Sequence, residues 1–105
     1  MTTALEATPQ EAYAATRRGE AVIIDVREPW EHEQMRIPGA VLIPLGDMPD
    51  RLAEIPEDRD VYMHCRSGGR SSRAVEYLRE HGRPRVFNVV GGIDAWKEAG
   101  LPVDE

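Results

Sequence analysis

The chain contains a single cysteine, Cys65, so no disulfide can form within it. It also lacks any apolar run close to the roughly 20 residues of a membrane-spanning helix. The segment from Met1 to Glu6 lacks the basic and apolar regions of a signal peptide. These absences predict a protein with no membrane partner. They also predict a cytoplasmic location, because a reducing environment keeps a lone thiol intact.

Basic residues are scarce. The chain has 13 Lys and Arg against 19 Asp and Glu, and the net charge of −6 argues against binding to nucleic acid. Residues 1–64 hold 13 acidic residues and six arginines, whereas residues 66–85 hold six arginines and only two glutamates. An acidic body with a positive patch around Cys65 predicts a small anionic partner, because such a patch attracts anions.

Histidines and tryptophans are also few. The three histidines are scattered, and beside one cysteine they make no metal-binding pattern, so we predict no metal site. His32 and His81 are expected at the surface. His64 adjoins Cys65, but neighbours on a strand face opposite sides, which argues against a Cys–His catalytic pair. Two side chains are expected to be packing anchors, Trp30 and Trp96.

Apolar runs alternate with helical patterns along the chain. Runs rich in β-branched residues predict strands at residues 21–26, 39–43, 61–64 and 85–90. Capping and periodicity signals predict helices at residues 9–18, 28–33, 48–55, 71–81 and 93–99, the first entered through a capping box of Thr8 and Glu11. The alternation predicts an α/β fold with a mainly parallel central sheet and helices on both faces. The length of 105 residues predicts one domain over residues 1–105.

The most informative run is Cys65-Arg66-Ser67-Gly68-Gly69-Arg70-Ser71, between a predicted strand and a predicted helix. A strand that ends at Cys65 places the sulfur at the carboxyl edge of a parallel sheet, where ligands bind in such folds. The glycines let successive N–H groups point inward, and the helix N-terminus adds positive potential. A free thiol titrates near ~8.5, and such surroundings lower its pKa to roughly 3.5–7.5. We therefore predict a thiolate nucleophile for an anionic substrate.

The remaining loop residues are expected to bind that substrate: Arg66, Ser67, Gly68, Gly69, Arg70 and Ser71. Arg70 either binds the substrate anion or braces the loop, and Arg66 either contacts the substrate or points to solvent. The hydroxyls of Ser67 and Ser71 are candidates for hydrogen bonds to the sulfur, although Ser71 could instead only cap the helix.

Two charged residues, Asp25 and Arg27, end a predicted strand near the same sheet edge. We expect them to form a salt bridge or hydrogen bonds that orient the loop without touching the substrate.

Four motifs, in this order, resemble those of the rhodanese-like sulfurtransferases. They are Asp25-Val26-Arg27-Glu28, Ile37-Pro38-Gly39-Ala40 with Ile43-Pro44-Leu45, the Cys65–Ser71 loop, and Gly91-Gly92-Ile93-Asp94-Ala95-Trp96. The resemblance covers nearly the whole chain and implies that family's three-layer fold. Two positions differ from the family pattern: Met35-Arg36 replaces a common Gly-His pair, and Gly69 replaces a common Asn. The second change loosens the loop and bears on substrate preference.

The resemblance also implies a reaction. The Cys65 thiolate attacks the outer sulfur of thiosulfate or a similar donor, sulfite leaves, and a cysteine persulfide remains. Cyanide or a thiol then takes the sulfur, so one transfer is split into two steps. No metal or organic cofactor is implied. A protein could also be the acceptor, in which case the chain would act as a sulfur-relay module.

The rival enzyme class is a small cysteine phosphatase or arsenate reductase, which also places a thiolate in an arginine-closed loop. Its signature has one residue more than the four between Cys65 and Arg70. The tighter ring of N–H groups suits a sulfur atom better than a phosphoryl group, and no aspartate is an obvious leaving-group acid. The sequence therefore favours sulfur transfer.

Overall fold

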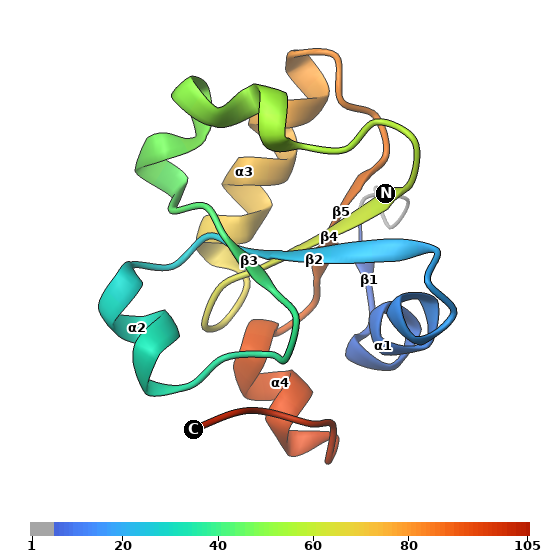
Figure 1. Ribbon diagram of the computed structural model, residues 1–105, viewed down its shortest axis with the longest axis vertical. Coiled ribbons are helices and arrows are strands. Elements are labelled where there is room, and N and C mark those ends of the chain that lie inside the picture. The colour runs from blue at the N-terminus through green and yellow to red at the C-terminus, as the bar shows by residue number, and fades with distance from the viewer. Residues whose placement is uncertain (1–5) are drawn as a thin grey trace.

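The computed structural model describes residues 6–105, whose strands form one parallel sheet in the order β1-β5-β4-β2-β3 (Figure 1). The strands are β1 (Glu6–Ala7), β2 (Ala21–Asp25), β3 (Val41–Leu42), β4 (Asp60–His64) and β5 (Val86–Val89). The helices are α1 (Pro9–Arg17), α2 (Pro29–Gln34), the 3₁₀ segment η2 (Leu45–Glu54), α3 (Gly69–Glu80) and α4 (Gly92–Glu98). The predicted α/β fold with a parallel sheet is confirmed.

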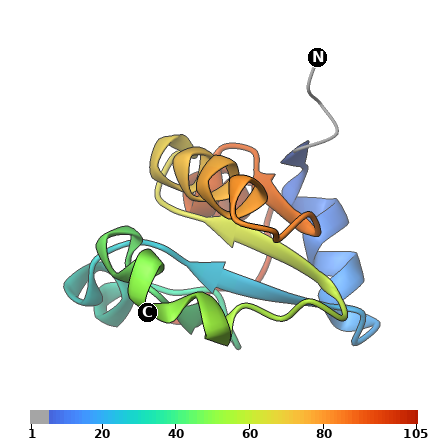
Figure 2. The same cartoon turned by 90° about the horizontal axis from the view of Figure 1, so that it is seen from above.

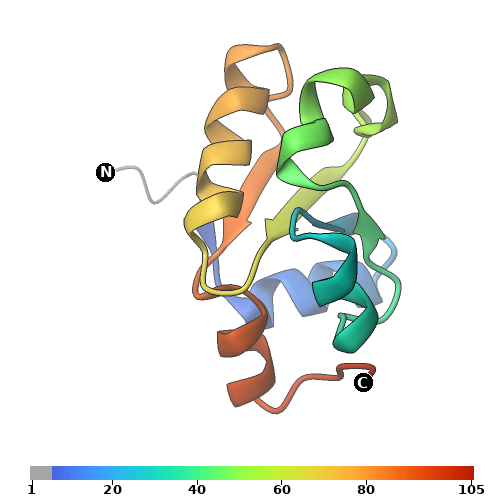
Figure 3. The same cartoon turned by 90° about the vertical axis from the view of Figure 1, so that its left-hand side faces the viewer.

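Side-chain alternation along β4 builds two cores. Val61 and Met63 belong to the core under α3 and η2, whereas Tyr62 packs in a second core with Trp96 of α4. Successive side chains on a strand point to opposite faces, so one apolar strand supplies both cores. α3 and η2 lie side by side over one face of the sheet, and α1 and α4 lie on the other, as Figures 2 and 3 show.

The predicted capping box at the start of α1 is present. The backbone N–H of Glu11 donates to Oγ1 of Thr8 at 3.1 Å, and the N–H of Thr8 donates to Oε1 of Glu11 at 2.9 Å. These two bonds satisfy backbone donors that the first helical turn leaves without partners. The local sequence therefore determines where this helix begins.

Helix α3 begins at Gly69, two residues before the predicted start at Ser71. Gly68 caps it with a φ of 113°, a left-handed conformation in which a side chain would be strained. The loop is consequently shorter than predicted, and Arg70 and Ser71 both lie in the first helical turn.

Several element predictions were wrong. Residues 45–54 form 3₁₀ turns with a kink at Arg51, and Pro49 inside them cannot donate the hydrogen bond that an α-helix needs. The strand predicted at 39–43 is shortened to β3, and the two-residue β1 was not predicted, because so short a strand has no readable pattern. Within residues 6–105, no helix combines the length and apolar character needed to cross a membrane.

The two tryptophans differ. Trp96 is buried and its Nε1–H donates to the carbonyl oxygen of Pro102 at 2.7 Å, so it is the packing anchor that was predicted. Trp30 is 62% exposed on α2, and the prediction that it anchors the core was wrong. α2 has six residues and no buried side chain, so it offers Trp30 no core to enter.

Candidate active site at the Cys65 loop

Cys65 follows β4 directly, at the carboxyl edge of the sheet, and its side chain is buried. The backbone N–H of Gly68 donates to Sγ of Cys65 at 3.1 Å, and the hydroxyl of Ser71 lies 3.5 Å from the same sulfur. Both donors belong to the turn that starts α3, so the positive end of that helix also faces the sulfur. The loop therefore surrounds the sulfur with groups that favour a negative charge.

These donors decide the ionisation of the cysteine. Burial by itself raises the pKa of the Cys65 thiol, because a buried charge loses its hydration. Hydrogen bonds from the Ser71 hydroxyl and from the backbone N–H groups of Ser71, Gly68 and Ser67 act in the opposite direction and outweigh it. The net result is a pKa below the ordinary value of a cysteine, as an activated thiolate requires.

The start of α4 supports the loop from its other side. The N–H of Ile93 donates to the carbonyl of Cys65 at 2.9 Å, and the N–H of Asp94 donates to the carbonyl of Arg66 at 3.1 Å. Gly92 lies against these carbonyls, and a Cβ there would be 2.4 Å from the Cys65 oxygen. The glycine of the last motif is thus explained by the close approach of two backbones.

Arg70 is held in place by an acidic residue that was not predicted to belong to the site. Its Nη1 and Nη2 atoms donate to Oε1 and Oε2 of Glu31 on α2 at 2.8 and 3.0 Å. This two-point ion pair lowers the pKa of Glu31, chiefly through the hydrogen bonds from Arg70. Of the two predicted roles for Arg70, the geometry favours bracing, since its guanidinium is already paired.

Arg66 is exposed and its Nε lies 3.5 Å from Oδ2 of Asp94, so its charge is at the surface beside the loop. A groove of about 300 Å³ lies next to it, and its walls include Trp30, Met35 and Ile93. Ser67 is exposed and Gly69 is exposed at the start of α3, so the mouth of the loop is open to solvent. The side of the loop that faces solvent therefore carries the positive charge of Arg66.

The expected salt bridge between Asp25 and Arg27 is present and buried. Nε of Arg27 donates to Oδ1 of Asp25 at 3.0 Å, and Nη2 donates to Oδ2 at 2.9 Å. Nδ1 of His32 lies 2.9 Å from Oδ2 as well, and the His32 side chain is only 19% exposed, so the prediction of a surface position for His32 was wrong. Burial raises the pKa of Asp25, but the hydrogen bonds from Arg27 and the contact with His32 outweigh it, so the pKa is lowered. Neither charged residue contacts the sulfur among the described hydrogen bonds.

His64 connects this cluster to the cysteine through the backbone. Its Nδ1 lies 3.0 Å from the carbonyl oxygen of Cys65, which only accepts, so Nδ1 carries the proton. Burial is the main reason that the pKa of His64 is lowered, and the imidazole is therefore neutral. As predicted, His64 does not form a catalytic pair with the sulfur. His81 is exposed, also as predicted.

Asn88 of β5 was missed by the sequence interpretation. It is buried, its Oδ1 lies 2.5 Å from Oγ of Ser71, and its Nδ2 lies 3.4 Å from the carbonyl oxygen of Gly68. The available signal was a carboxamide inside the apolar strand Val86–Val89, where a buried polar side chain needs partners.

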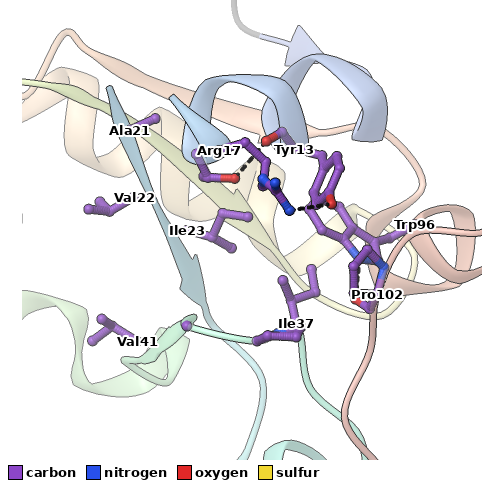
Figure 4. Close-up of a pocket in the computed structure, with 12 residues that line it drawn as sticks. Tyr13, Arg17, Ala21, Val22, Ile23, Ile37, Val41, Trp96 and Pro102 are labelled. Atoms are coloured by element: carbon purple, nitrogen blue, oxygen red, sulfur yellow. Dashed lines mark hydrogen bonds between the residues drawn. The ribbon is translucent and has the colours of Figure 1, made fainter. Parts of the chain in front are cut away.

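Among residues 6–105, no group of three or more His, Cys, Asp or Glu side chains is placed to hold a metal ion. A hollow of about 390 Å³ lies between α1, β2 and α4 and is lined mainly by apolar side chains such as Ile23 and Ile37 (Figure 4). In this hollow, Arg17 donates to the hydroxyl of Tyr13, and no residue of the Cys65 loop takes part.

The fold and the loop define a class of α/β protein with an anion-stabilising cradle around one cysteine. The family model of the rhodanese-like domain matches residues 8–99, and the chain therefore belongs to the rhodanese-like domain family.

Relatives of similar length are known. The chain is 46% identical over 84 residues to a sulfurtransferase from Allochromatium vinosum, with 80% of this chain and 78% of that protein aligned. It is 31% identical over 99 residues to the thiosulfate sulfurtransferase GlpE from Glaesserella parasuis serovar 5, covering 94% and 92% of the two chains. The crystal structure of a rhodanese-related protein from Thermoplasma volcanium matches with a TM-score of 0.86 and 29% identity, over 94% of this chain and 96% of that one. Some curated relatives are longer, and this chain spans only 39–40% of their length.

Proposed function

We propose that this protein transfers a sulfane sulfur from thiosulfate or a similar small anion to cyanide or a thiol, through a persulfide on Cys65. The observation that carries the proposal is the cradle itself: the Cys65 sulfur accepts a hydrogen bond from Gly68 at 3.1 Å and lies 3.5 Å from the Ser71 hydroxyl. The thiosulfate sulfurtransferase of G. parasuis, which is similar over most of its length, supports the same reaction.

The first step is a displacement at sulfur. The Cys65 thiolate attacks the outer sulfur of thiosulfate, a new S–S bond forms, and the bond to the sulfite group breaks with its electron pair. The lowered pKa of the thiol raises the fraction of Cys65 that is present as the attacking thiolate. The loop N–H groups, already oriented toward the sulfur, stabilise the negative charge that moves onto the cysteine persulfide.

The second step reverses the roles. Cyanide or a thiolate attacks the outer sulfur of the persulfide, and the electron pair of the S–S bond returns to Sγ of Cys65. In this proposal Arg66, which is exposed beside the loop, attracts both anions, and Arg70 braces the first turn of α3 through Glu31. The reaction needs no metal or organic cofactor, and the same persulfide could pass its sulfur to a protein thiol.

Steady-state kinetics tests the proposal. A two-step transfer through a covalent intermediate predicts parallel double-reciprocal plots when thiosulfate is varied at several cyanide concentrations. Intersecting plots would contradict a free persulfide intermediate. If the protein hydrolysed a phenyl phosphate ester and released no sulfite from thiosulfate, the loop would instead belong to a phosphatase.

A further inference from the structure

The Ser71 hydroxyl has more acceptors than protons. Its oxygen lies 2.5 Å from Oδ1 of Asn88, 3.3 Å from the carbonyl oxygen of Gly68 and 3.5 Å from Sγ of Cys65. A hydroxyl has one proton to donate, so these acceptors compete for it. Asn88 is the nearest of the three. The hydrogen bond that Ser71 can offer the sulfur therefore depends on Asn88.

The fold places Asn88 for this role. In β5, Val86 packs in the core under α3, and alternation along the strand turns Asn88 to the same face two residues later. At the position of Asn88, this face of the sheet packs against the first turn of α3 and not against the apolar side of that helix. The carboxamide therefore lies beside Ser71 and Gly68. Asn88 is 6% exposed, which means that water does not compete for these bonds.

The orientation of the carboxamide follows from its neighbours. Nδ2 of Asn88 lies 3.4 Å from the carbonyl oxygen of Gly68, an acceptor. Turning the amide over would put two acceptors, Oδ1 and this carbonyl, against each other. Oδ1 therefore faces Ser71 and accepts its proton.

We propose that Asn88 is a positioning residue that acts through Ser71. Its Oδ1 accepts the hydrogen bond from the Ser71 hydroxyl while Cys65 is a neutral thiol. When the thiolate or the persulfide anion forms, the hydroxyl turns from Asn88 and donates that hydrogen bond to the sulfur. Asn88 does not touch the sulfur. The Ser71 hydroxyl must give up its hydrogen bond to Asn88 before it can donate to the sulfur. Asn88 therefore reduces the stabilisation that the thiolate gains from Ser71 and shifts the balance toward the thiol.

The charged and titratable groups around the sulfur do not belong to this pair. They are Arg66 of the loop with Asp94 of α4, Arg70 of α3 with Glu31 of α2, and His64 of β4 with Asp25 of β2, whose carboxylate Arg27 and His32 also contact. In the described part of the chain, no hydrogen bond or ion pair joins any of these side chains to Asn88 or Ser71. Replacing Asn88 or Ser71 therefore leaves these charges in place.

The test is the pH profile of thiol alkylation by iodoacetamide, which reports the thiolate fraction of the only cysteine. Asn88→Ala removes the competing acceptor, and we expect the midpoint of the profile to fall by about half a pH unit, the size of one modest hydrogen bond. Ser71→Ala removes the donor and should raise the midpoint by a similar amount. The carbonyl of Gly68 keeps the N–H of Ser72 at 3.0 Å in either variant.

The double variant decides the matter. If Asn88 acts through Ser71, adding Asn88→Ala to Ser71→Ala leaves the midpoint where Ser71→Ala alone puts it. Asn88→Leu refills the volume but has no acceptor, so it should reproduce the fall; this separates loss of the acceptor from loosening of the loop by a smaller side chain. An unchanged or raised midpoint in both Asn88 variants, or a fall that persists without Ser71, would overturn the proposal. The readout needs no sulfur donor, so its outcome is independent of the proposed sulfur transfer.

Discussion

Gly92 and Cys65 approach each other so closely that a Cβ on Gly92 would lie 2.4 Å from the Cys65 carbonyl oxygen. The contact exists because the first N–H groups of α4 hold the carbonyls of the cysteine loop. The backbone of one motif therefore positions the nucleophile of another.

Gly92→Ala is the first prediction. The added methyl group clashes with backbone, and φ at this position is +60°, so we expect a loss of about 2 kcal/mol or more in the free energy of unfolding and a loss of sulfur transfer. Urea unfolding and the thiosulfate assay measure the two effects. Gly46→Ala is the matched control, because no atom from a distant part of the chain lies within 4 Å of its Cβ position and its φ is not in the left-handed range. Equal stability of the two variants would refute the close approach.

Glu31→Gln should separate the effect of the Arg70 charge from the effect of its paired geometry. Removing the carboxylate breaks the two-point ion pair and leaves the guanidinium charge unneutralised near the loop. We expect a loss of about 1 kcal/mol in stability and a lower KM for thiosulfate, since more positive charge faces the anion. Steady-state kinetics at low ionic strength would show it. A higher KM would mean that the paired geometry of Arg70 matters more than its free charge.

The buried Asp25 carboxylate predicts a pH dependence of stability. Its folded pKa lies below the unfolded value of about 3.9, so its stabilising contribution is present above that pH and is lost as the pH falls through the folded pKa. Urea unfolding between pH 7 and pH 2.5 should therefore show stability falling below about pH 4.

Asp25→Asn is the matching variant. It should cost about 3 kcal/mol at neutral pH, because Arg27 keeps a buried charge without its partner. It should also flatten the acid limb, leaving the smaller slope from Glu31, whose pKa is lowered in the same direction. An acid limb as steep as that of the unmodified protein would show that Asp25 is not the titrating group.

The two tryptophans provide a contrast within one chain. Trp96→Ala should cost about 3–5 kcal/mol, because a large buried side chain leaves a cavity in the second core. Trp30→Ala should change stability by less than about 0.5 kcal/mol, since the side chain is 62% exposed. Comparable losses in urea unfolding would place Trp30 in a contact that the described structure does not contain.

Local patterns predicted the parallel α/β fold, the capping box of α1 and the Cys65 loop, because each depends on neighbouring residues. The contacts that complete the site were missed because they join distant positions. Glu31 and Arg70 are 39 residues apart, and Asn88 and Ser71 are 17 apart. Nothing in the local sequence shows which strands are neighbours, so the strand order and these pairs could be known only from the folded chain.

The position of His32 illustrates the same limit. A single histidine on a short exposed helix is typical of the surface, yet its Nδ1 reaches the Asp25 carboxylate at 2.9 Å. The Asp25–Arg27 salt bridge could be predicted from the sequence, because its two residues lie two positions apart at a strand end. The contact of His32 with this salt bridge could not be predicted, because it depends on how α2 packs.

The central claim is the persulfide on Cys65, and the most direct measurement is the intact mass of the reduced protein after mixing with thiosulfate in the absence of reductant. The account predicts a gain of one sulfur atom that is removed by cyanide and is absent in Cys65→Ser, with the fold of that variant verified by its urea unfolding curve. An unchanged mass in the unmodified protein, or the same gain in Cys65→Ser, would contradict sulfur transfer through this cysteine.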